Sequence, residues 1–311
     1  MKNGLVLEGG AMRGLFTAGV LDALMRHGVE FDGIVGVSAG AAFGCNLKSR
    51  QIGRVLRYNL QFCRDWRYAS WCSWLRTGDF FGAEFCYRTL PEKLDPFDAP
   101  EFARNPTEFH LVCTDIERGE AVYRKCGTAD AETMEYMRAS ASMPLVSRIV
   151  EVDGRKLLDG ALSDSIPLGY FERLGFARNL VVLTQPEGFA KRPTRALALM
   201  KFVYRRYPRL VELAAKRHEM YNAQLEYVRQ AERAGRALVL RPADKLPIGR
   251  VCHDPETIEN THRIGVETAG KRLVLRFPEM LKVEISSGRF SPEFGKILDN
   301  PVLILRGEFE I

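Results

Sequence analysis

Ser38 is the residue whose surroundings most clearly indicate chemistry in this sequence. It lies in the segment GIVGVSAGAAFG (33–44), where an apolar run leads into a serine flanked by Gly36 and Gly40. The pattern G-x-S-x-G is typical of a strand that turns sharply into a helix and presents a nucleophilic serine at the turn. The alternative is a tight turn whose serine only caps the following helix. The motif by itself does not decide between the two.

A glycine-rich loop, EGGAMRG (8–14), follows the first apolar run. Backbone N–H groups at a helix start point outward unpaired and favour negative charge, which suits an oxyanion hole built from Gly9, Gly10 or Ala11. One such donor typically lowers an acyl-transfer barrier by about 3 kcal/mol. Arg13 either adds positive charge there or is an ordinary surface arginine. The loop contains neither GK[ST] nor GxGxxG, which disfavours nucleotide binding.

A nucleophilic serine needs a base, and Asp159 is the favoured one. It ends the apolar run RKLLD (155–159) and precedes Gly160, and parallel α/β sheets place their sites at the carboxyl edge of the strands. Burial must then raise the pKa of this carboxyl for it to act near neutral pH. Asp164, in a polar loop, is the alternative. No strand followed by a catalytic turn precedes any of the five histidines, His27, His110, His218, His253 and His262.

Apolar runs and helix-like segments alternate along the chain, which predicts an α/β fold with a mainly parallel sheet covered on both faces. Strands are expected over 4–10, 32–38, 109–125 (two strands around a turn), 155–161 and 179–186. Helices are expected over 15–28 and from residue 39 onward. An aromatic-rich insertion at 58–90 interrupts this alternation, and we expect its aromatic side chains to pack on the core rather than to form a membrane-facing rim.

The character of the chain changes near residue 194. A helical pattern runs to a stop at Gly235 with a break at Pro208, and a short strand (237–244) and a helix (254–273) follow. The sequence therefore predicts a catalytic domain over 1–190 and a mainly helical C-terminal region over 191–311 that caps the site. The basic run 201–217 is read as a solvated helix face in preference to a membrane-binding one.

These three motifs, in this order and spacing, resemble those of the patatin-like phospholipases. The resemblance covers roughly residues 4–186 and includes CTDIERGEAVY (113–123) and the run RASASMPLVSRIVEVDGRKLLDGALSDSIPL (138–168). It implies a three-layer α/β/α fold and a Ser–Asp dyad in place of a triad. Two positions depart from the family pattern: Ala11 replaces the third glycine of the loop, and Ser165 stands where asparagine is common. Ala11 fits only if its φ is negative.

Carried over by position, the resemblance makes Ser38 the nucleophile and Asp159 the base. The oxyanion hole is then made by Gly9, Gly10 and Ala11, and the supporting positions are Arg13, Gly14, Gly36, Gly40 and Gly160. The expected activity is that of a serine lipid acyl hydrolase acting on phospholipid or another acyl ester, with no metal and no cofactor. The alternatives are a non-catalytic lipid-binding or regulatory protein on the same fold and a hydrolase of small esters or thioesters.

Composition limits the class of protein further. The 311 residues are 46% hydrophobic and 27% charged, which is typical of a globular protein, and no apolar run is long enough to cross a membrane. The seven cysteines include no CxxC pair, and the N-terminus reads as a buried strand rather than a signal peptide, so a cytoplasmic location is expected. The net charge of +6 leaves peripheral contact with the inner membrane surface open. No motif favours nucleic acid.

Overall fold

One sheet organises the protein. The computed structural model describes residues 1–276, with side chains as far as residue 272, and the compact unit described below is Met1–Ala269. Its eight strands follow the order β5-β6-β3-β2-β1-β7-β8, and β4 also pairs with β3. Parallel pairings join β1 (Lys2–Leu7), β2 (Gly33–Val37), β3 (Glu108–Asp115), β7 (Phe176–Val182) and β8 (Ala237–Leu240). Antiparallel pairings add β4 (Glu120–Cys126), β5 (Val150–Val152) and β6 (Arg155–Asp159).

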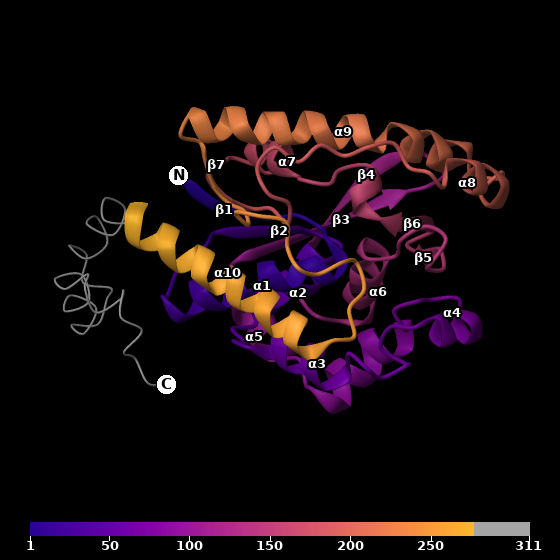
Figure 1. Cartoon of the computed structure of the whole chain (residues 1–311), viewed down its shortest axis with the longest axis horizontal. Helices are drawn as coiled ribbons and strands as arrows, with labels where there is room; N and C mark the ends of the chain where they lie inside the picture. The colour runs from indigo at the N-terminus through magenta and orange to yellow at the C-terminus, as the bar shows by residue number, and fades with distance from the viewer. Residues whose placement is uncertain (277–311) are drawn as a thin grey trace. The chain divides into compact units, whose positions relative to one another are not determined.

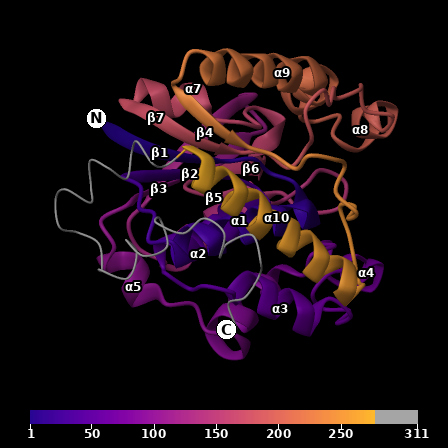
Figure 2. The same cartoon turned by 60° about the vertical axis from the view of Figure 1, so that its left-hand side comes forward.

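Helices cover both faces of the sheet (Figure 1). On one face, α7 (Leu168–Arg173) and α9 (Pro208–Arg233) pack their apolar side chains on alternate residues of the strands, including Val6 and Val35. On the other face lie α1 (Gly14–Arg26), α2 (Ala39–Lys48) and α6 (Ala131–Ser140), as the turned view in Figure 2 also shows. Strand residues are buried on both sides, as expected for a sheet between two helical layers. The three-layer α/β/α fold is therefore confirmed, with antiparallel strands added at one side of a parallel core.

The aromatic-rich insertion contains helices that the sequence did not indicate. They are α3 (Arg54–Phe62), α4 (Trp71–Thr77) and the π-helix η2 (Phe85–Leu94), followed by α5 (Ala99–Arg104). Tyr58 and Tyr68 are buried, as expected for core packing, whereas Trp71 and Leu75 are 63% and 76% exposed. The expectation of core packing therefore holds for part of the insertion only.

The C-terminal elements follow the predicted order. The break at Pro208 separates α8 (Leu197–Val203) from α9, and proline is tolerated as the first residue of α9 because its missing N–H has no helical partner there. Gly235 follows α9 with a φ of 71°, and β8 then extends the sheet beside β7. The last described element is α10 (Pro255–Arg276). Within residues 1–276, no helix combines the length and apolar character needed to cross a membrane.

Candidate active site

Ser38 occupies the turn between β2 and α2. Its φ of 55° and ψ of −124° place a non-glycine residue in a sparsely populated region, as at the strained turn that presents a nucleophilic serine. The Ser38 side chain forms no capping hydrogen bond with α2. The interpretation of Ser38 as a helix cap is therefore wrong, and the hydroxyl group is available for another role.

The glycines around Ser38 are required because backbone segments pass very close together. A Cβ atom at Gly40 would lie 2.5 Å from the carbonyl oxygen of Leu7, and one at Gly36 would lie 2.5 Å from the carbonyl oxygen of Gly40. One at Gly9 would lie 2.9 Å from the Cβ atom of Ser38. These contacts hold the glycine-rich loop after β1 (8–14) against the serine turn.

Gly14 and Gly160 also lie where two segments pass too close for a side chain. A Cβ atom at Gly14 would lie 2.9 Å from that of Ala39, and one at Gly160 would lie 2.2 Å from the carbonyl oxygen of Val112. No side chain larger than hydrogen fits at either point without moving main chain or a packed neighbour.

Ser140, the last residue of α6, is hydrogen-bonded to the backbone of the serine turn. It was not identified from the sequence. The backbone N–H of Ser38 donates to the Ser140 hydroxyl at 3.0 Å, and this hydroxyl donates to the carbonyl oxygen of Val112 at 2.6 Å. The sequence signal was the run of small residues RASAS, but nothing in it distinguishes a serine at this position from one on a surface.

The loop after β1 presents unpaired backbone donors beside Ser38. In the described part of the chain, the N–H groups of Gly9, Gly10 and Ala11 donate no hydrogen bond, and neither does that of Ala39, the first residue of α2. Ala39 was not identified from the sequence, although the residue after the nucleophile is a common oxyanion donor. Ala11 has a φ of 50°, so the expectation of a negative φ is wrong. Alanine tolerates this region at a cost of about 1–2 kcal/mol.

Glu8 anchors this loop from within the protein. Its carboxylate, 2% exposed, accepts hydrogen bonds from the backbone N–H of Thr184 at 2.6 Å and from the Tyr221 hydroxyl at 2.6 Å. Tyr221 belongs to α9 and Thr184 follows β7, so two elements distant in sequence fix the residue that precedes Gly9 and Gly10.

Asp159 lies near Ser38 as expected, but the strand that carries it runs in a different direction from the one expected. β6 is antiparallel to β3, so the argument from the carboxyl edge of parallel strands does not apply to it. Val37 pairs with Val112, and Asp159 pairs with the next residue of β3, Cys113. Since β4 occupies the other side of β3, β2 and β6 lie end to end along one side. The chain leaving β2 and the end of β6 therefore meet at Ser38.

The Asp159 carboxyl is buried and polarised. Burial raises its pKa, while the Arg217 guanidinium, the Ala161 N–H and a hydrogen bond from the Ser38 hydroxyl act in the opposite direction. The Ala161 N–H lies 2.8 Å from the carboxylate. The alternative base, Asp164, accepts hydrogen bonds from Tyr123 and Gln224 and lines neither cavity described below. The structure thus brings Asp159, and not Asp164, to the serine.

Two cavities meet at Ser38, which lines both together with Ala11 and Met143. The narrow cavity, of about 130 Å³, has mostly apolar walls from α2, α6 and the insertion, including Ala42, Phe43, Tyr58, Tyr68, Phe81 and Met137. The wide cavity, of about 910 Å³, is lined by Gly9, Gly10, Asp159 and a set of basic residues that includes Arg13, Lys191, Arg217 and Arg250. The site is therefore apolar on one side of the serine and positively charged on the other.

Two arginines lie differently from the bland expectation for them. Arg13 lines the wide cavity and is not an ordinary surface arginine. Arg217 also lines this cavity, although its neighbours in the basic run form surface ion pairs.

His218 and His253 also line the wide cavity. Ser165 donates its hydroxyl to the carbonyl oxygen of Ala161 at 2.8 Å. No cluster of three potential metal ligands exists among residues 1–276.

A serine at a strained strand-to-helix turn, beside a glycine loop on an α/β sheet, defines the class of protein to which this chain belongs. The chain is a member of the patatin-like phospholipase family, whose model matches residues 5–171. A second model, for a domain of unknown function (DUF6363), matches residues 207–280.

Curated relatives share this region at low identity. An uncharacterized protein of Escherichia coli K12, YjjU, is 28% identical over 201 residues, which is 58% of this chain and 52% of that protein. Lysophospholipase nte1 of Aspergillus niger is 30% identical over 178 residues, 55% of this chain and 11% of that protein. An uncharacterized NTE family protein of Mycobacterium tuberculosis, MT1093, is 27% identical over 164 residues, 53% of this chain and 44% of that protein. The matches span about half or less of each relative's length.

Proposed function

We propose that the protein is a serine lipid acyl hydrolase that cleaves the carboxylic ester of a phospholipid or lysophospholipid, with Ser38 as nucleophile and Asp159 as base. The observation that carries the proposal is the position of Ser38: it lines the same cavity as the buried Asp159 carboxyl, at the point where β2 and β6 end, and lies between an apolar and a cationic cavity. Membership of the patatin-like phospholipase family and similarity to a lysophospholipase support it.

In the proposed mechanism, Ser38 Oγ attacks the ester carbonyl carbon while its proton passes to the Asp159 carboxylate. The free N–H groups of Gly9, Gly10, Ala11 and Ala39 stabilise the negative charge that develops on the carbonyl oxygen. When the C–O bond of the ester breaks, Asp159 returns the proton to the departing alcohol and the acyl group stays on Ser38. Water then attacks the acyl-enzyme, again losing its proton to Asp159, and the fatty acid leaves as the Ser38 hydroxyl is restored.

A fluorophosphonate probe tests the nucleophile directly. We expect covalent labelling at Ser38, mapped by peptide mass spectrometry, together with release of fatty acid from a lysophospholipid. A protein that binds lipid, gives no labelling and releases no fatty acid would instead be the non-catalytic binding protein on the same fold.

The narrow cavity is proposed to hold the acyl chain. Ala42, on α2, lines this cavity and not the wide one. Ala42→Phe places a ring where the chain would extend, so we expect kcat/KM for p-nitrophenyl laurate to fall about tenfold or more while that for p-nitrophenyl acetate changes little. Ala243→Phe, an exposed alanine outside both cavities, is the matched control. Equal losses on both esters in the Ala42 variant would argue against an acyl site here.

We also propose that the wide cavity opens at a lipid surface. Trp71 of α4 and Met200 of α8 line this cavity, and the two helices lie on the same side of the molecule in both Figure 1 and Figure 2. Each exposes large apolar side chains: Leu75 is 76% exposed on α4 and Phe202 is 71% exposed on α8. Apolar side chains in a basic setting suit an anionic membrane interface.

A vesicle assay tests this surface. The double variant Leu75→Ser, Phe202→Ser should weaken co-sedimentation with phosphatidylglycerol vesicles by about tenfold or more, because each side chain gives up apolar area that the bilayer would cover. Leu174→Ser is the control. Leu174 is also exposed, at 43%, but it belongs to neither α4 nor α8, so this variant should bind vesicles like the wild type. Equal binding by both variants would contradict the proposed orientation.

A further inference from the structure

The wide cavity carries an excess of positive charge that the proposed mechanism does not use. Six lysines and arginines line it, against two carboxylates, Glu8 and Asp159. The most enclosed of these cations come from separate segments: Arg13 from η1 (Ala11–Arg13), Lys191 from the loop after β7, and Arg217 from α9. Arg250, from the segment before α10, completes a group of four that we call the cationic cluster.

The two carboxylates are already occupied. Glu8 accepts hydrogen bonds from Thr184 and Tyr221, and Asp159 accepts one from the Ala161 N–H and lies beside Ser38. Glu8 acts electrostatically on Arg13, and Asp159 on Arg217, but neither carboxylate forms a direct ion pair with a member of the cationic cluster. The nearest anionic charges are committed to positioning the loop and to the serine.

The cationic cluster has no ion-pair partner within the described residues. The Arg13 Nε atom is buried without any hydrogen-bond partner, and Arg217 donates its Nε–H to the carbonyl oxygen of Ala161 at 2.7 Å. Lys191 Nζ lies 4.4 Å from the centroid of the Tyr221 ring. Most of the donors that these side chains offer therefore remain available to a ligand in the cavity.

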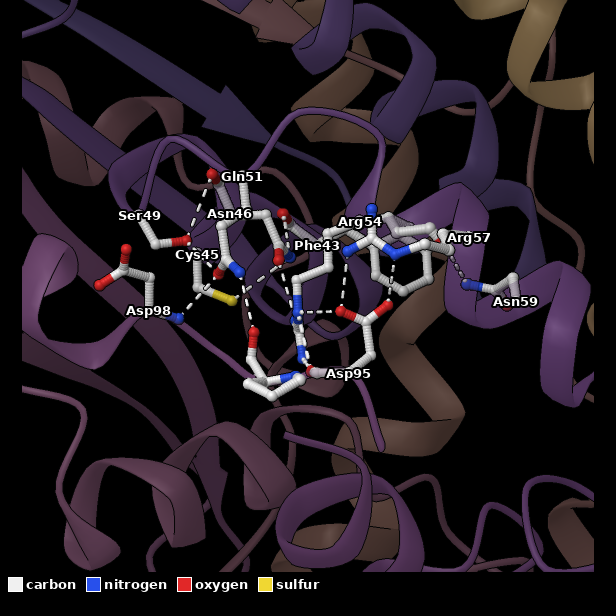
Figure 3. A network of polar contacts seen from close by, with 12 residues as sticks. Phe43, Cys45, Asn46, Ser49, Gln51, Arg54, Arg57, Asn59, Asp95 and Asp98 are labelled. Carbon is white, nitrogen blue, oxygen red and sulfur yellow. Dashed lines mark hydrogen bonds and ion pairs between the residues drawn. The ribbon is translucent and has the colours of Figure 1, made fainter. Parts of the chain in front are cut away.

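A buried arginine elsewhere in the same protein shows the contrast. Arg54, which also borders the narrow cavity, donates to the Asn46 side chain at 3.0 Å and pairs with the Asp95 carboxylate at 3.3 Å. Arg57 adds two hydrogen bonds to that carboxylate, at 2.9 and 2.8 Å, so the three charged side chains form one satisfied network (Figure 3). The buried Arg54 therefore has a carboxylate partner, which the members of the cationic cluster lack.

Burial disfavours the charged form of three members of the cluster, Arg13, Lys191 and Arg217. Burial lowers the pKa of Lys191 to about 8, with Arg217, Arg250 and Arg13 acting in the same direction and Glu8 opposing them. Burial also lowers the pKa of Arg13, which the Glu8 carboxylate opposes, and the pKa of Arg217, which the Asp159 carboxylate opposes; Arg250 adds to the lowering in both. Like charges held together out of water are unfavourable unless an anion joins them.

We propose that Arg13, Lys191, Arg217 and Arg250 bind the phosphate group of a phospholipid head, with the scissile ester at Ser38 and the acyl chain in the narrow cavity. This assignment rests on the proposed function and names the residues that would hold the phosphate of its substrate, three of them after residue 190. Guanidinium and ammonium groups are the usual phosphate ligands of proteins, and the oxygens of one phosphate can accept from several of them at once. A neutral acylglycerol would leave the cluster unsatisfied.

A binding experiment tests the site without relying on catalysis. In a Ser38→Ala background, we expect glycerol 3-phosphate to bind, by calorimetry at constant ionic strength, and glycerol not to bind. Lys191→Gln and Arg250→Gln should each weaken that binding by about tenfold, as loss of a charge-assisted hydrogen bond predicts. Arg178→Gln, an exposed arginine outside both cavities, is the matched control and should bind like its parent. Equal affinity in all four proteins would overturn the assignment.

A hydrolysis experiment distinguishes a lipid head group from free phosphate. The wild-type protein should prefer oleoyl lysophosphatidylglycerol over monooleoylglycerol, and Lys191→Gln and Arg250→Gln should each lower the ratio of the two kcat/KM values about tenfold. Binding of inorganic phosphate without any such preference would overturn the head-group assignment in favour of a free-phosphate site. Hydrolysis of both lipids at equal rates, with no binding of glycerol 3-phosphate or inorganic phosphate, would overturn the cationic site but leave the proposed hydrolase intact. Absence of hydrolysis with intact glycerol 3-phosphate binding would do the reverse.

Discussion

Replacement of Ser38 by alanine is expected to remove ester hydrolysis almost completely, lowering kcat/KM by roughly 10⁴- to 10⁶-fold, as loss of the nucleophile does in serine hydrolases. The variant keeps the two cavities and the free N–H groups of the loop, so it should still bind substrate. Fatty acid release from a lysophospholipid and turnover of p-nitrophenyl acetate are the measurements. Substantial turnover of both would remove Ser38 from the mechanism.

Ser38→Gly provides a control that separates chemistry from folding. Ser38 holds a φ of 55° and a ψ of −124°, which costs a non-glycine residue about 1–3 kcal/mol. Glycine adopts this conformation freely but gains more freedom in the unfolded chain, which offsets about 0.5–1 kcal/mol. We therefore expect Ser38→Gly to be inactive yet about 1 kcal/mol more stable to unfolding than Ser38→Ala. A glycine variant that is less stable than the alanine variant would mean that the turn carries no strain.

The serine turn could be predicted from the sequence because everything it needs is local. An apolar strand, a serine between glycines and a helical segment are contiguous, and the glycines at 36 and 40 follow from main-chain contacts within that stretch and with the neighbouring strand end. The conformation of Ala11 could not be predicted. Its positive φ depends on how the loop is held by Glu8 and by the hydrogen bond from Met12 to Arg250, over two hundred residues away.

Asp159 was chosen for a reason that the fold does not support. The sequence shows a carboxylate at the end of an apolar strand, but not that this strand is antiparallel to β3 and lies in line with β2. The direction and register of β6 depend on its pairing with β3, a segment about 40 residues earlier in the chain. The sequence of β6 alone does not indicate either of them. The residue was indicated by its local setting, while its approach to Ser38 is a property of the assembled sheet.

The cationic cluster was beyond the reach of sequence reasoning for a related reason. Lys191 and Arg217 each lie in a basic stretch, and Arg250 is a single arginine between apolar residues; at all three positions a solvated cation is the ordinary interpretation. Their convergence requires β8 to extend the sheet and α9 to lie across it, so that three segments after residue 190 reach the loop that starts at Gly9. Tyr221 of α9 adds a direct link, since it donates to Glu8 immediately before that loop.

Replacement of Asp159 by asparagine is expected to be the second change with a very large effect. The amide keeps an oxygen for the Ala161 N–H but cannot take the Ser38 proton, so kcat/KM should fall by roughly 10³-fold or more at neutral pH. In the wild-type protein, activity should appear as the carboxyl ionises. Because burial raises the pKa of Asp159, the acid limb of kcat/KM against pH should lie above the usual range of an aspartate.

Asp164→Asn is the matched control for this variant. Asp164 is also buried with a raised pKa caused first by burial, but it is hydrogen-bonded to Tyr123 and Gln224 away from both cavities. Activity per folded molecule should therefore stay within a few-fold of wild type. If the Asp164 variant lost activity and the Asp159 variant kept it, Asp164 and not Asp159 would be the base.

Stability gives a second, independent measure of Asp159. Its pKa is raised in the folded protein, so the folded state binds this proton more tightly than the unfolded state does. The corresponding stabilisation is complete at pH values below the unfolded pKa and is lost as the pH rises through the folded pKa. Asparagine does not titrate, so the melting temperature of Asp159→Asn relative to wild type should increase from pH 4 to pH 8. A relative melting temperature that instead falls over this range would mean that the ionised carboxylate is favoured in the folded protein, and an Asp159 held in that way would be too weak a base to activate Ser38.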